Sequence, residues 1–381
     1  METPLKRTWA EIDLDNLTHN FNVIRAQVGP EPKLLGVVKA DAYGHGAVQV
    51  AKKLEELGAA YLAVSNIDEA AELREGGVTL PVLMLGYTPA EQAERIVRLG
   101  MTQAVPNLEI ARAYDAAAAR AGKKMKVHIK LDTGMGRLGF QCDDAHFDAS
   151  LRDIRAVLAL GNLDVEGVFT HFAVSDEDAP EHIAFTKTQH ERFLKMIDAA
   201  EQGGFRFRLH HCCNAGGIAS HPEWAWDMVR CGIILYGTGE LAERMGMKPV
   251  MRLKTVVSTV KDFDPDTSVS YGRTFYTDRP SRIAVLPIGY ADGLHRALSN
   301  RLTVLTPYGE ARQVGRICMD MCMIDATELP RLAPGDEVEV YGGHMLCETA
   351  AKACGTISYE LLCAVSKRVP RIYFENGKAI D

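Results

Sequence analysis

The sequence predicts an α/β protein in which an N-terminal (β/α)8 TIM barrel is followed by a mostly β C-terminal domain. Before Tyr236, eight short apolar runs alternate with stretches whose apolar residues recur at the three- and four-residue spacing of an amphipathic helix. After about Thr238, the pattern changes to short alternating segments bounded by turn residues. We therefore expect a barrel domain over residues 1–238 and a β domain over residues 239–381, with the first dozen residues as candidates for pairing with the β domain.

The expected barrel strands are apolar runs bounded by turn residues or by the ends of helical patterns. In chain order they are residues 34–39, 61–65, 81–86, 102–106, 125–132, 165–172, 206–214 and 227–237. Helical stretches such as 46–58 and 108–122 separate them. A doubly wound dinucleotide-binding sheet would carry a GxGxxG fingerprint after its first strand, and the sequence has none there, so the TIM barrel is favoured. The expected strands of the β domain lie in residues 251–263, 282–290, 301–309 and 336–343.

Composition narrows the class of protein. The 381 residues are 47% hydrophobic and carry a formal charge of −7, which is enough apolar content for a large core and gives no bulk attraction to nucleic acid or to an acidic membrane. No signal peptide is evident, and no apolar run approaches the roughly 20 residues that cross a bilayer. We expect a cytoplasmic protein.

The cysteines favour reduced thiols. There are nine, an odd number, and no two form a CxxC pair. The run "HHCC" from His210 to Cys213 is a weak metal candidate, because neighbouring side chains of a strand point to opposite faces and cannot all reach one ion. We expect no metal site.

Polar residues gather at the expected ends of the barrel strands, where TIM barrels carry their chemistry. Taken singly, a strand-end lysine is usually solvated, and a lone histidine is usually a hydrogen-bonded structural residue. Together they suit a lysine that bonds covalently to an aldehyde cofactor whose phosphate is bound by glycine-rich loops and helix N-termini. The residues concerned are Lys39, Lys130, Asp132, Arg137, His171, Asn214 and Arg230.

From about Trp9 to Tyr373 the chain resembles the bacterial alanine racemase family, which are fold-type III enzymes dependent on pyridoxal 5'-phosphate. The resemblance rests on ordered motifs: "VVKADAYGHG", "HIKLDTGMGRLGF", "THFA", "RCGIILYG", "SYGRTF", "PIGYADG", "GRICMDM" and the pattern from Tyr359 to Tyr373. It implies a homodimer whose active sites combine the barrel of one subunit with the β domain of the other. It also implies interconversion of L- and D-alanine, which supplies D-alanine for peptidoglycan.

By this resemblance, two residues are the acid/base groups. Lys39 matches the lysine that holds the cofactor covalently and later transfers protons, and Tyr271 matches the tyrosine that acts from the opposite side of the cofactor plane. Two such groups explain racemisation, because one removes the Cα proton and the other returns a proton from behind. Without the other motifs, Tyr271 would be read as an exposed aromatic residue on a strand.

Other matches concern the cofactor. Arg230 resembles the arginine that hydrogen-bonds the pyridine nitrogen, which should leave that nitrogen unprotonated and make the ring a weaker electron sink than in aminotransferases. His171 resembles the histidine that links Arg230 to Tyr271. The residues that match the phosphate-binding set are Tyr43, Asn214, Ala215, Gly232, Ile233 and Tyr359.

The remaining matches concern the substrate. Arg137 resembles the residue that positions the substrate carboxylate and the cofactor hydroxyl; Met319 supplies a backbone contact in the family, with Asp320 beside it, and Tyr290 with Tyr359 would narrow the entrance. Lys130 falls where many members carry a carbamylated lysine that orients the arginine numbered Arg137 here. An unmodified Lys130 paired with Asp132 is the alternative.

One position departs from the family. Where the family usually has Asn-Ser after the seventh strand, this chain has Asn214-Ala215, which removes a hydroxyl expected on the cofactor phosphate. Gly216 and Gly217 follow, and their backbone N–H groups could approach the phosphate instead.

Three alternatives stay open at this point. Serine or broad amino-acid specificity is one, because a pocket rejects a substrate with one added hydroxyl only weakly. A fold-type III amino-acid decarboxylase is a second, although such enzymes usually have a GGG phosphate loop, which is absent here. A cofactor-carrying regulatory protein is the third, and the β domain with Tyr271 and Met319 argues against it.

Overall fold

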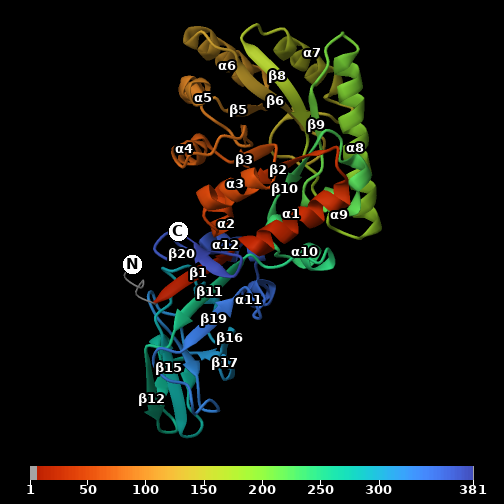
Figure 1. Cartoon of the computed structure of the whole chain (residues 1–381). Helices are drawn as coiled ribbons and strands as arrows, with labels where there is room; N and C mark the ends of the chain where they lie inside the picture. Colours follow the sequence, from red (N-terminus) through yellow and green to blue (C-terminus); the bar gives the residue numbers. More distant parts are fainter. Residues whose placement is uncertain (1–6, 381) are drawn as a thin grey trace. The chain divides into compact units, whose positions relative to one another are not determined.

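The computed structural model describes residues 7–380 and divides them into two compact units (Figure 1). The barrel unit comprises residues 21–42 and 47–235. The β unit comprises residues 7–20, 43–46 and 236–380 of the described chain. The proposed domain boundary at residues 238 and 239 stays a prediction.

The eight expected barrel strands are confirmed. They form one parallel sheet in the order β10-β2-β3-β4-β5-β6-β8-β9, and the backbone N–H of Arg230 donates to the carbonyl of Cys213 (3.0 Å), which joins the two ends of this order. A short strand, β7 (Phe140–Gln141), pairs with β6. The barrel strands are β2 (Lys33–Val37), β3 (Tyr61–Val64), β4 (Val82–Met84), β5 (Thr102–Val105), β6 (Met125–Asp132), β8 (Leu163–Phe169), β9 (Leu209–His211) and β10 (Met228–Cys231).

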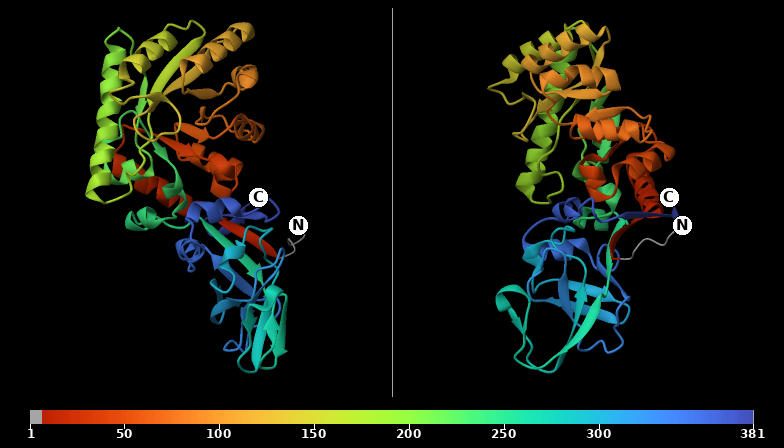
Figure 2. Two further views of the ribbon diagram at one scale, coloured as in Figure 1. Left: turned by 180° about the vertical axis from the view of Figure 1, so that it is seen from behind. Right: turned by 90° about the vertical axis from the view of Figure 1, so that its left-hand side faces the viewer.

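Helices surround these strands, as Figures 1 and 2 show from three sides. Their starts and stops follow the sequence: Asn66 and Asn107 accept backbone hydrogen bonds at two helix N-termini, and Gly100 and Gly122 end two helices in the left-handed conformation. The longer helices are α3 (Ala47–Glu56), α4 (Ile67–Glu75), α5 (Ala93–Leu99), α6 (Leu108–Ala121), α7 (Phe147–Leu158) and α8 (Pro180–Glu201), followed by the short α9 (Ala215–Ser220). This covering explains why the strands are apolar on both faces.

The β unit is mostly β, as the sequence predicts. Its main sheet has the order β12-β15-β18-β17-β16-β19-β11-β1-β20-β21. Alternating burial along β11 (Met251–Val256) shows a sheet with one face packed on a core. The other strands are β1 (Thr8–Asp13), β12 (Thr259–Phe263), β15 (Ser281–Leu286), β16 (Thr303–Thr306), β17 (Gly309–Val314), β18 (Cys322–Asp325), β19 (Glu337–Tyr341), β20 (Arg371–Glu375) and β21 (Lys378–Ile380).

Smaller elements complete the β unit. A two-stranded ribbon of β13 (Ser268–Val269) and β14 (Phe275–Tyr276) stands apart from the main sheet. Three short helices, α10 (Glu240–Arg244), α11 (Cys347–Cys354) and α12 (Ser358–Ala364), belong to this unit, and α1 (Leu14–Val28) contributes residues to both units. Among the described residues, no helix combines the length and apolar character needed to span a membrane.

The first barrel strand ends earlier than the sequence suggests. We expected it to run to Lys39, but β2 stops at Val37, and Lys39 begins a helical turn labelled α2 (Lys39–Gly44). Four consecutive non-glycine residues of that turn have φ between 52° and 54°, so the turn is left-handed (Ala40, Asp41, Ala42 and Tyr43). No local propensity favours such a run, which costs roughly 1–2 kcal/mol per residue.

Two neighbouring glycines allow a matched test of the packing in the β unit. Both have positive φ, but a Cβ on Gly237 would lie 1.7 Å from the carbonyl oxygen of Lys248, whereas nothing lies within 4 Å of a Cβ on Gly239. We expect Gly239→Ala to lower the free energy of unfolding by about 1–2 kcal/mol through backbone strain alone, because its φ of 101° and ψ of 155° suit only glycine. Gly237→Ala should lower it by about 3 kcal/mol or more, because overpacking adds to strain. Chemical denaturation of both variants checks this, and equal losses would show that Lys248 does not restrict the site.

Candidate active site

Lys39 is held at the start of the left-handed turn by a carboxylate from the next strand-to-helix segment. Glu69 accepts a hydrogen bond from the backbone N–H of Ala40 (2.8 Å) with one oxygen and from that of Ser65 (2.7 Å) with the other. Asp41 in the turn accepts the N–H of Ala47 at the start of α3 (2.8 Å). Strained backbone of this kind persists only where surrounding contacts fix it, and it is concentrated at functional sites.

The loop after β6 is organised by one carboxylate. Asp132 accepts the backbone N–H groups of Gly134 and Gly136 (both 3.0 Å) and of Arg137 (3.1 Å). The side chain of Arg137 is exposed, and it makes no hydrogen bond or ion pair with any described residue. Asp132 therefore shapes the "TGMGRLG" loop so that a guanidinium is presented to solvent.

Lys130 is a buried cation beside that loop. Its Nζ donates to the carbonyl of Leu131 (2.8 Å) and lies 5.2 Å from the centre of the Phe169 ring, and it forms no ion pair with Asp132 within the described chain. Burial, followed by the charge of Arg230, lowers the pKa of Lys130 to about 7. The neutral amine of Lys130 is therefore accessible near neutral pH.

Arg230 lies in the barrel and is 3% exposed. Its two terminal nitrogens donate to the carbonyls of His211 (3.0 Å) and Cys212 (2.9 Å), and they contact Nδ1 of His211 (3.3 Å) and of His171 (3.4 Å). The guanidinium binds no carboxylate, and its Nε makes no hydrogen bond to a described residue. Burial lowers the pKa of Arg230 to about 10, which leaves it charged near neutral pH.

His171, which the resemblance places between Arg230 and Tyr271, does contact Arg230. Burial, followed by the charge of Arg230, lowers its pKa well below the usual value, so the imidazole is neutral. Its contact with Tyr271 stays a prediction.

The expected phosphate set is divided between the two units. In the barrel unit, Asn214 caps α9 and accepts hydrogen bonds from the N–H of Gly217 (3.1 Å) and the hydroxyl of Ser175 (2.8 Å), with Ala215 as the first helical residue. Gly232 and Ile233 follow β10 directly. In the β unit, the rings of Tyr43 and Tyr359 meet edge to face with centroids 6.2 Å apart.

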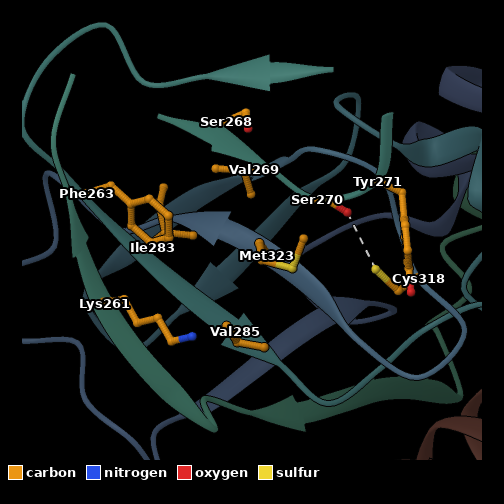
Figure 3. Close-up of a pocket in the computed structure, with 10 residues that line it drawn as sticks. All are labelled: Lys261, Phe263, Ser268, Val269, Ser270, Tyr271, Ile283, Val285, Cys318 and Met323. Atoms are coloured by element: carbon orange, nitrogen blue, oxygen red, sulfur yellow. Dashed lines mark hydrogen bonds between the residues drawn. The ribbon is translucent and has the colours of Figure 1, made fainter. Parts of the chain in front are cut away.

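Tyr271 is the most exposed aromatic side chain among the described residues, at 71%. It follows Ser270, whose φ of 69° turns the chain sharply after β13. Figure 3 shows Tyr271 at one end of a mainly apolar pocket of about 400 Å³, with Cys318 close by. Ser270 contacts the sulfur of Cys318 (3.5 Å), and Phe263 and Met323 help to line the pocket.

An ion cluster centred on the buried Asp292 holds the loop that carries Met319. Asp292, 1% exposed, accepts hydrogen bonds from Nε of Arg368 (2.8 Å) and from the backbone N–H of Gly289 (2.8 Å). Arg368 also donates to the carboxylate of Asp320 (2.7 Å). The N–H of Ala291 donates to the carbonyl of Met319 (3.0 Å). Asp320 is thus a loop anchor in this structure.

Tyr290 and Met319 are both surface residues of the β unit, 43% and 53% exposed. They lie on neighbouring segments, because the N–H of Tyr290 donates to the carbonyl of Cys318 (3.0 Å). Together with Tyr271 they give this unit three exposed side chains that the resemblance assigns to the active site.

The "HHCC" run does not gather around one point. His210 contacts the carboxylate of Asp227 (2.7 Å), whereas the thiols of Cys212 and Cys213 both donate to the carbonyl of Trp224 (3.3 and 3.2 Å). His211 points to Arg230, a role that the sequence analysis missed. Strand alternation carried a signal for a second missed residue, because it places His128 on the same face of β6 as Lys130.

The chain matches two family models over most of its length. The model described as "Alanine racemase, N-terminal domain" matches residues 12–240, and "Alanine racemase, C-terminal domain" matches residues 250–373. Alanine racemase 2 of Caldanaerobacter subterraneus subsp. tengcongensis is 44% identical, with 99% of this chain and 97% of the relative covered. Alanine racemase of Desulfovibrio desulfuricans is 45% identical, with 96% and 98% covered.

Solved structures agree. Alanine racemase of Clostridium difficile 630 superposes with a TM-score of 0.94 at 40% identity, covering 100% of this chain and 98% of that one. The alanine racemase of Bacillus anthracis with bound L-Ala-P has a TM-score of 0.89 at 32% identity, with the same coverage. The resemblance stated from the motifs is confirmed, and the chain belongs to the alanine racemase family.

Proposed function

We propose that the protein is an alanine racemase that interconverts L- and D-alanine with pyridoxal 5'-phosphate. The observation that supports this best is the buried guanidinium of Arg230, which is held by carbonyls and neutral imidazoles and by no carboxylate. A cation at this place suits a pyridine nitrogen that stays unprotonated. An aminotransferase instead needs an acidic partner there.

The donor set of the barrel unit fits the cofactor. Lys39 supplies an amine that can react with the cofactor aldehyde. The Nε–H of Arg230 makes no hydrogen bond to a described residue, so it can donate to the ring nitrogen. Asn214, Gly232 and Ile233 match the sequence positions with which the family binds the phosphate, and Tyr43 and Tyr359 match the tyrosines of that set. When bound, pyridoxal phosphate supplies an electron sink that stabilises negative charge at the substrate Cα.

Two residues of the chain move the proton. Lys39 removes or returns it at Nζ on one face of the substrate Cα, and the Tyr271 hydroxyl does so on the other face. Neutral His171 faces Arg230 with Nδ1, which must accept, so its proton is on Nε2 and it is suited to donate to the Tyr271 oxygen. Because each group serves one face, the bound enantiomer decides which of them removes the proton, and the other must start protonated to return one.

Substrate binding is assigned to Arg137, Met319 and Tyr290. The guanidinium of Arg137 pairs with no residue between 7 and 380, so within this part of the chain it can bind a carboxylate without first breaking an ion pair. Met319 offers backbone to the same carboxylate, and the Asp292–Arg368–Asp320 cluster keeps its loop in place. Tyr290 with Tyr359 would restrict the entrance to small side chains. Serine, one hydroxyl larger, is the closest competitor of alanine.

The absence of a serine after Asn214 changes which groups of this loop can donate hydrogen bonds to the cofactor phosphate. The side-chain amide nitrogen of Asn214 already donates to the carbonyl of Phe172 (3.2 Å), so it is not free to replace the missing hydroxyl. Backbone N–H groups near Gly216 are the remaining donors from this loop.

We further propose a homodimer in which each site takes Lys39 from one subunit and Tyr271 from the other. Tyr271, Met319 and Tyr290 are exposed on the β unit, which suits residues completed by a partner subunit. The product D-alanine would serve peptidoglycan synthesis. All nine cysteines are free, which suits the reducing cytoplasm.

The proposal is tested by following optical rotation after pyridoxal phosphate and L-alanine are added to the purified protein. A racemase drives the rotation to zero with no loss of amino acid. Release of carbon dioxide would instead indicate a decarboxylase, and an unchanged rotation a cofactor carrier. Comparing kcat/KM for alanine and serine tests the substrate, and a larger value for serine would overturn that assignment.

Lys39→Ala should abolish the covalent link to the cofactor and nearly all racemisation, because no other amine replaces it. The visible absorbance band that reports the link measures the first effect directly. A variant that kept this band would show that another residue holds the cofactor.

Lys130 should carry a carbamate, formed when its neutral amine attacks carbon dioxide and loses a proton. Native mass spectrometry should show the added mass of one carbon dioxide, absent from Lys130→Ala. After the carbamate is removed in mild acid, activity should return faster at about pH 8 than at about pH 6 at equal dissolved carbon dioxide, because the neutral fraction rises as pH passes about 7. A pH-independent return would contradict the role of the Lys130 amine.

Mixing two dead variants tests the shared site. Lys39→Ala and Tyr271→Ala chains, dissociated and mixed equally, form mixed dimers as half of the population, and each mixed dimer has one site with both residues intact. Activity should recover to about a quarter of wild type. If both residues came from one chain, every site would lack one group, and confirmed mixed dimers would stay inactive.

A further inference from the structure

A chain of hydrogen-bonded side chains runs through the barrel from Arg230 to a carboxylate that the proposed reaction does not use. Nη1 of Arg230 contacts Nδ1 of His211 (3.3 Å), and Nε2 of His211 contacts Nδ1 of His128 (2.9 Å). Nε2 of His128 in turn contacts Oε2 of Glu166 (3.2 Å). The four residues come from four different strands: β10, β9, β6 and β8.

This chain of residues crosses the barrel interior. Tyr61 on β3 donates its hydroxyl to the same oxygen of Glu166, although β3 and β8 are separated in the sheet by β4, β5 and β6. Such a contact can be made only across the inside of the sheet. His128 and His211 are both fully buried, so water does not compete for their ring nitrogens.

The backbone is adapted to this arrangement at two points. The pairing of β6 with β8 shifts register so that Val127 pairs with Val165 and His128 with Gly167, which leaves Glu166 as the extra residue of a β-bulge. Bulges re-aim the side chains they contain. At Gly167, a Cβ would lie 2.9 Å from the His128 ring, so glycine makes room for that imidazole.

Arg230 and Glu166, the two ends of this series of side chains, fix the direction of every hydrogen bond within it. Arg230 can only donate, so Nδ1 of His211 accepts and its proton is on Nε2. That nitrogen donates to Nδ1 of His128, which places the proton of His128 on Nε2 as well. Glu166 can only accept when ionised, which matches this order. Cation and carboxylate therefore select the same tautomer for both histidines.

The charge states of His128, His211 and Glu166 agree with these hydrogen-bond directions. Burial lowers the pKa of His128 and, to a greater extent, that of His211, so both rings are neutral. Burial alone would raise the pKa of Glu166, but the hydrogen bonds from His128 and Tyr61 lower it to about 2. The other carboxylate oxygen of Glu166, Oε1, lies 3.2 Å from Nζ of Lys126, at the end of the series that is farthest from Arg230.

We propose that Glu166 is a positioning residue for the cofactor-binding arginine: through His128 and His211 it sets the proton arrangement that makes His211 an acceptor for Arg230. The inference rests on the proposed role of Arg230. If His211 carried its proton on Nδ1, an N–H would face the N–H of Arg230, and the guanidinium would turn away from its present position. A carboxylate excludes that reversed order, because it has no proton to donate to His128.

Neutron diffraction of deuterium-exchanged crystals of the wild-type holoenzyme tests the arrangement without any variant. We expect deuterium on Nε2 of both His128 and His211 and none on either Nδ1. Deuterium on Nδ1 of His211 would overturn the proposal.

Glu166→Gln tests the requirement for a carboxylate, because an amide of the same size can accept from His128 or donate to it. The reversed order should become populated, with deuterium appearing on Nδ1 of His211, and the dissociation constant of pyridoxal phosphate should rise about fivefold. Lys126→Gln is the matched control: it removes the closer of the two cations beside Oε1, with Arg208 remaining 3.9 Å away, and leaves the histidine order intact, so it should change neither quantity.

The proposal requires both effects in Glu166→Gln. An unchanged proton position, an unchanged dissociation constant, or an equal change in Lys126→Gln would each refute it. A wild-type protein that bound the cofactor but did not racemise alanine would refute the proposed function instead, because neither readout depends on turnover.

Discussion

The burial of a permanent cation, Arg230, is the constraint on which the barrel interior depends. A guanidinium that is 3% exposed loses most of its hydration, and every donor that remains unpaired costs free energy. Two backbone carbonyls and two neutral histidines of the barrel contact the guanidinium. No carboxylate of the described residues lies within hydrogen-bonding distance of it. A carboxylate there would neutralise the charge that we propose acts on the cofactor.

The same charge shapes its neighbours. Lys130 and Arg230 lie over one aromatic ring, Phe169, at 5.2 and 5.6 Å, and Arg230 helps to lower the pKa of both Lys130 and His171. Repulsion of this kind favours neutral partners, which are the groups that accept and pass protons near pH 7. At the rim, Asp132 and Glu69 bind backbone N–H groups instead of cations. These carboxylates hold the loop of Arg137 and the turn that begins at Lys39.

Much of this fold follows from periodicity in the sequence. Eight parallel strands and the sheet of the β unit follow from apolar spacing and turn residues, because burial pattern is local information. The left-handed turn from Ala40 to Tyr43 does not follow, since only Asp41 belongs to a residue type that adopts positive φ with any ease; distant contacts such as that with Glu69 impose the turn. For the same reason, the sequence analysis placed the end of the first barrel strand at Lys39, whereas β2 ends at Val37.

The candidate site was predictable in part. Strand ends in a barrel converge, so the position of Lys39, Lys130 and Arg230 near one end is expected from topology. The roles proposed for these residues were assigned from the motif resemblance, because their positions at strand ends do not by themselves specify a role. The bulge at Glu166 and the space above Gly167 depend on strand register, which single-sequence patterns do not determine, so the network behind Arg230 became visible only in three dimensions.

The central claim is that two groups exchange protons with alanine from opposite faces, and early-time racemisation in heavy water tests it most directly. With two groups, the proton taken from L-alanine and the one delivered to the product come from different sites, so D-alanine formed at low conversion should carry deuterium at Cα while the remaining L-alanine keeps its proton. D-alanine that retained the original proton would mean that one group carries it from face to face, which would contradict the account.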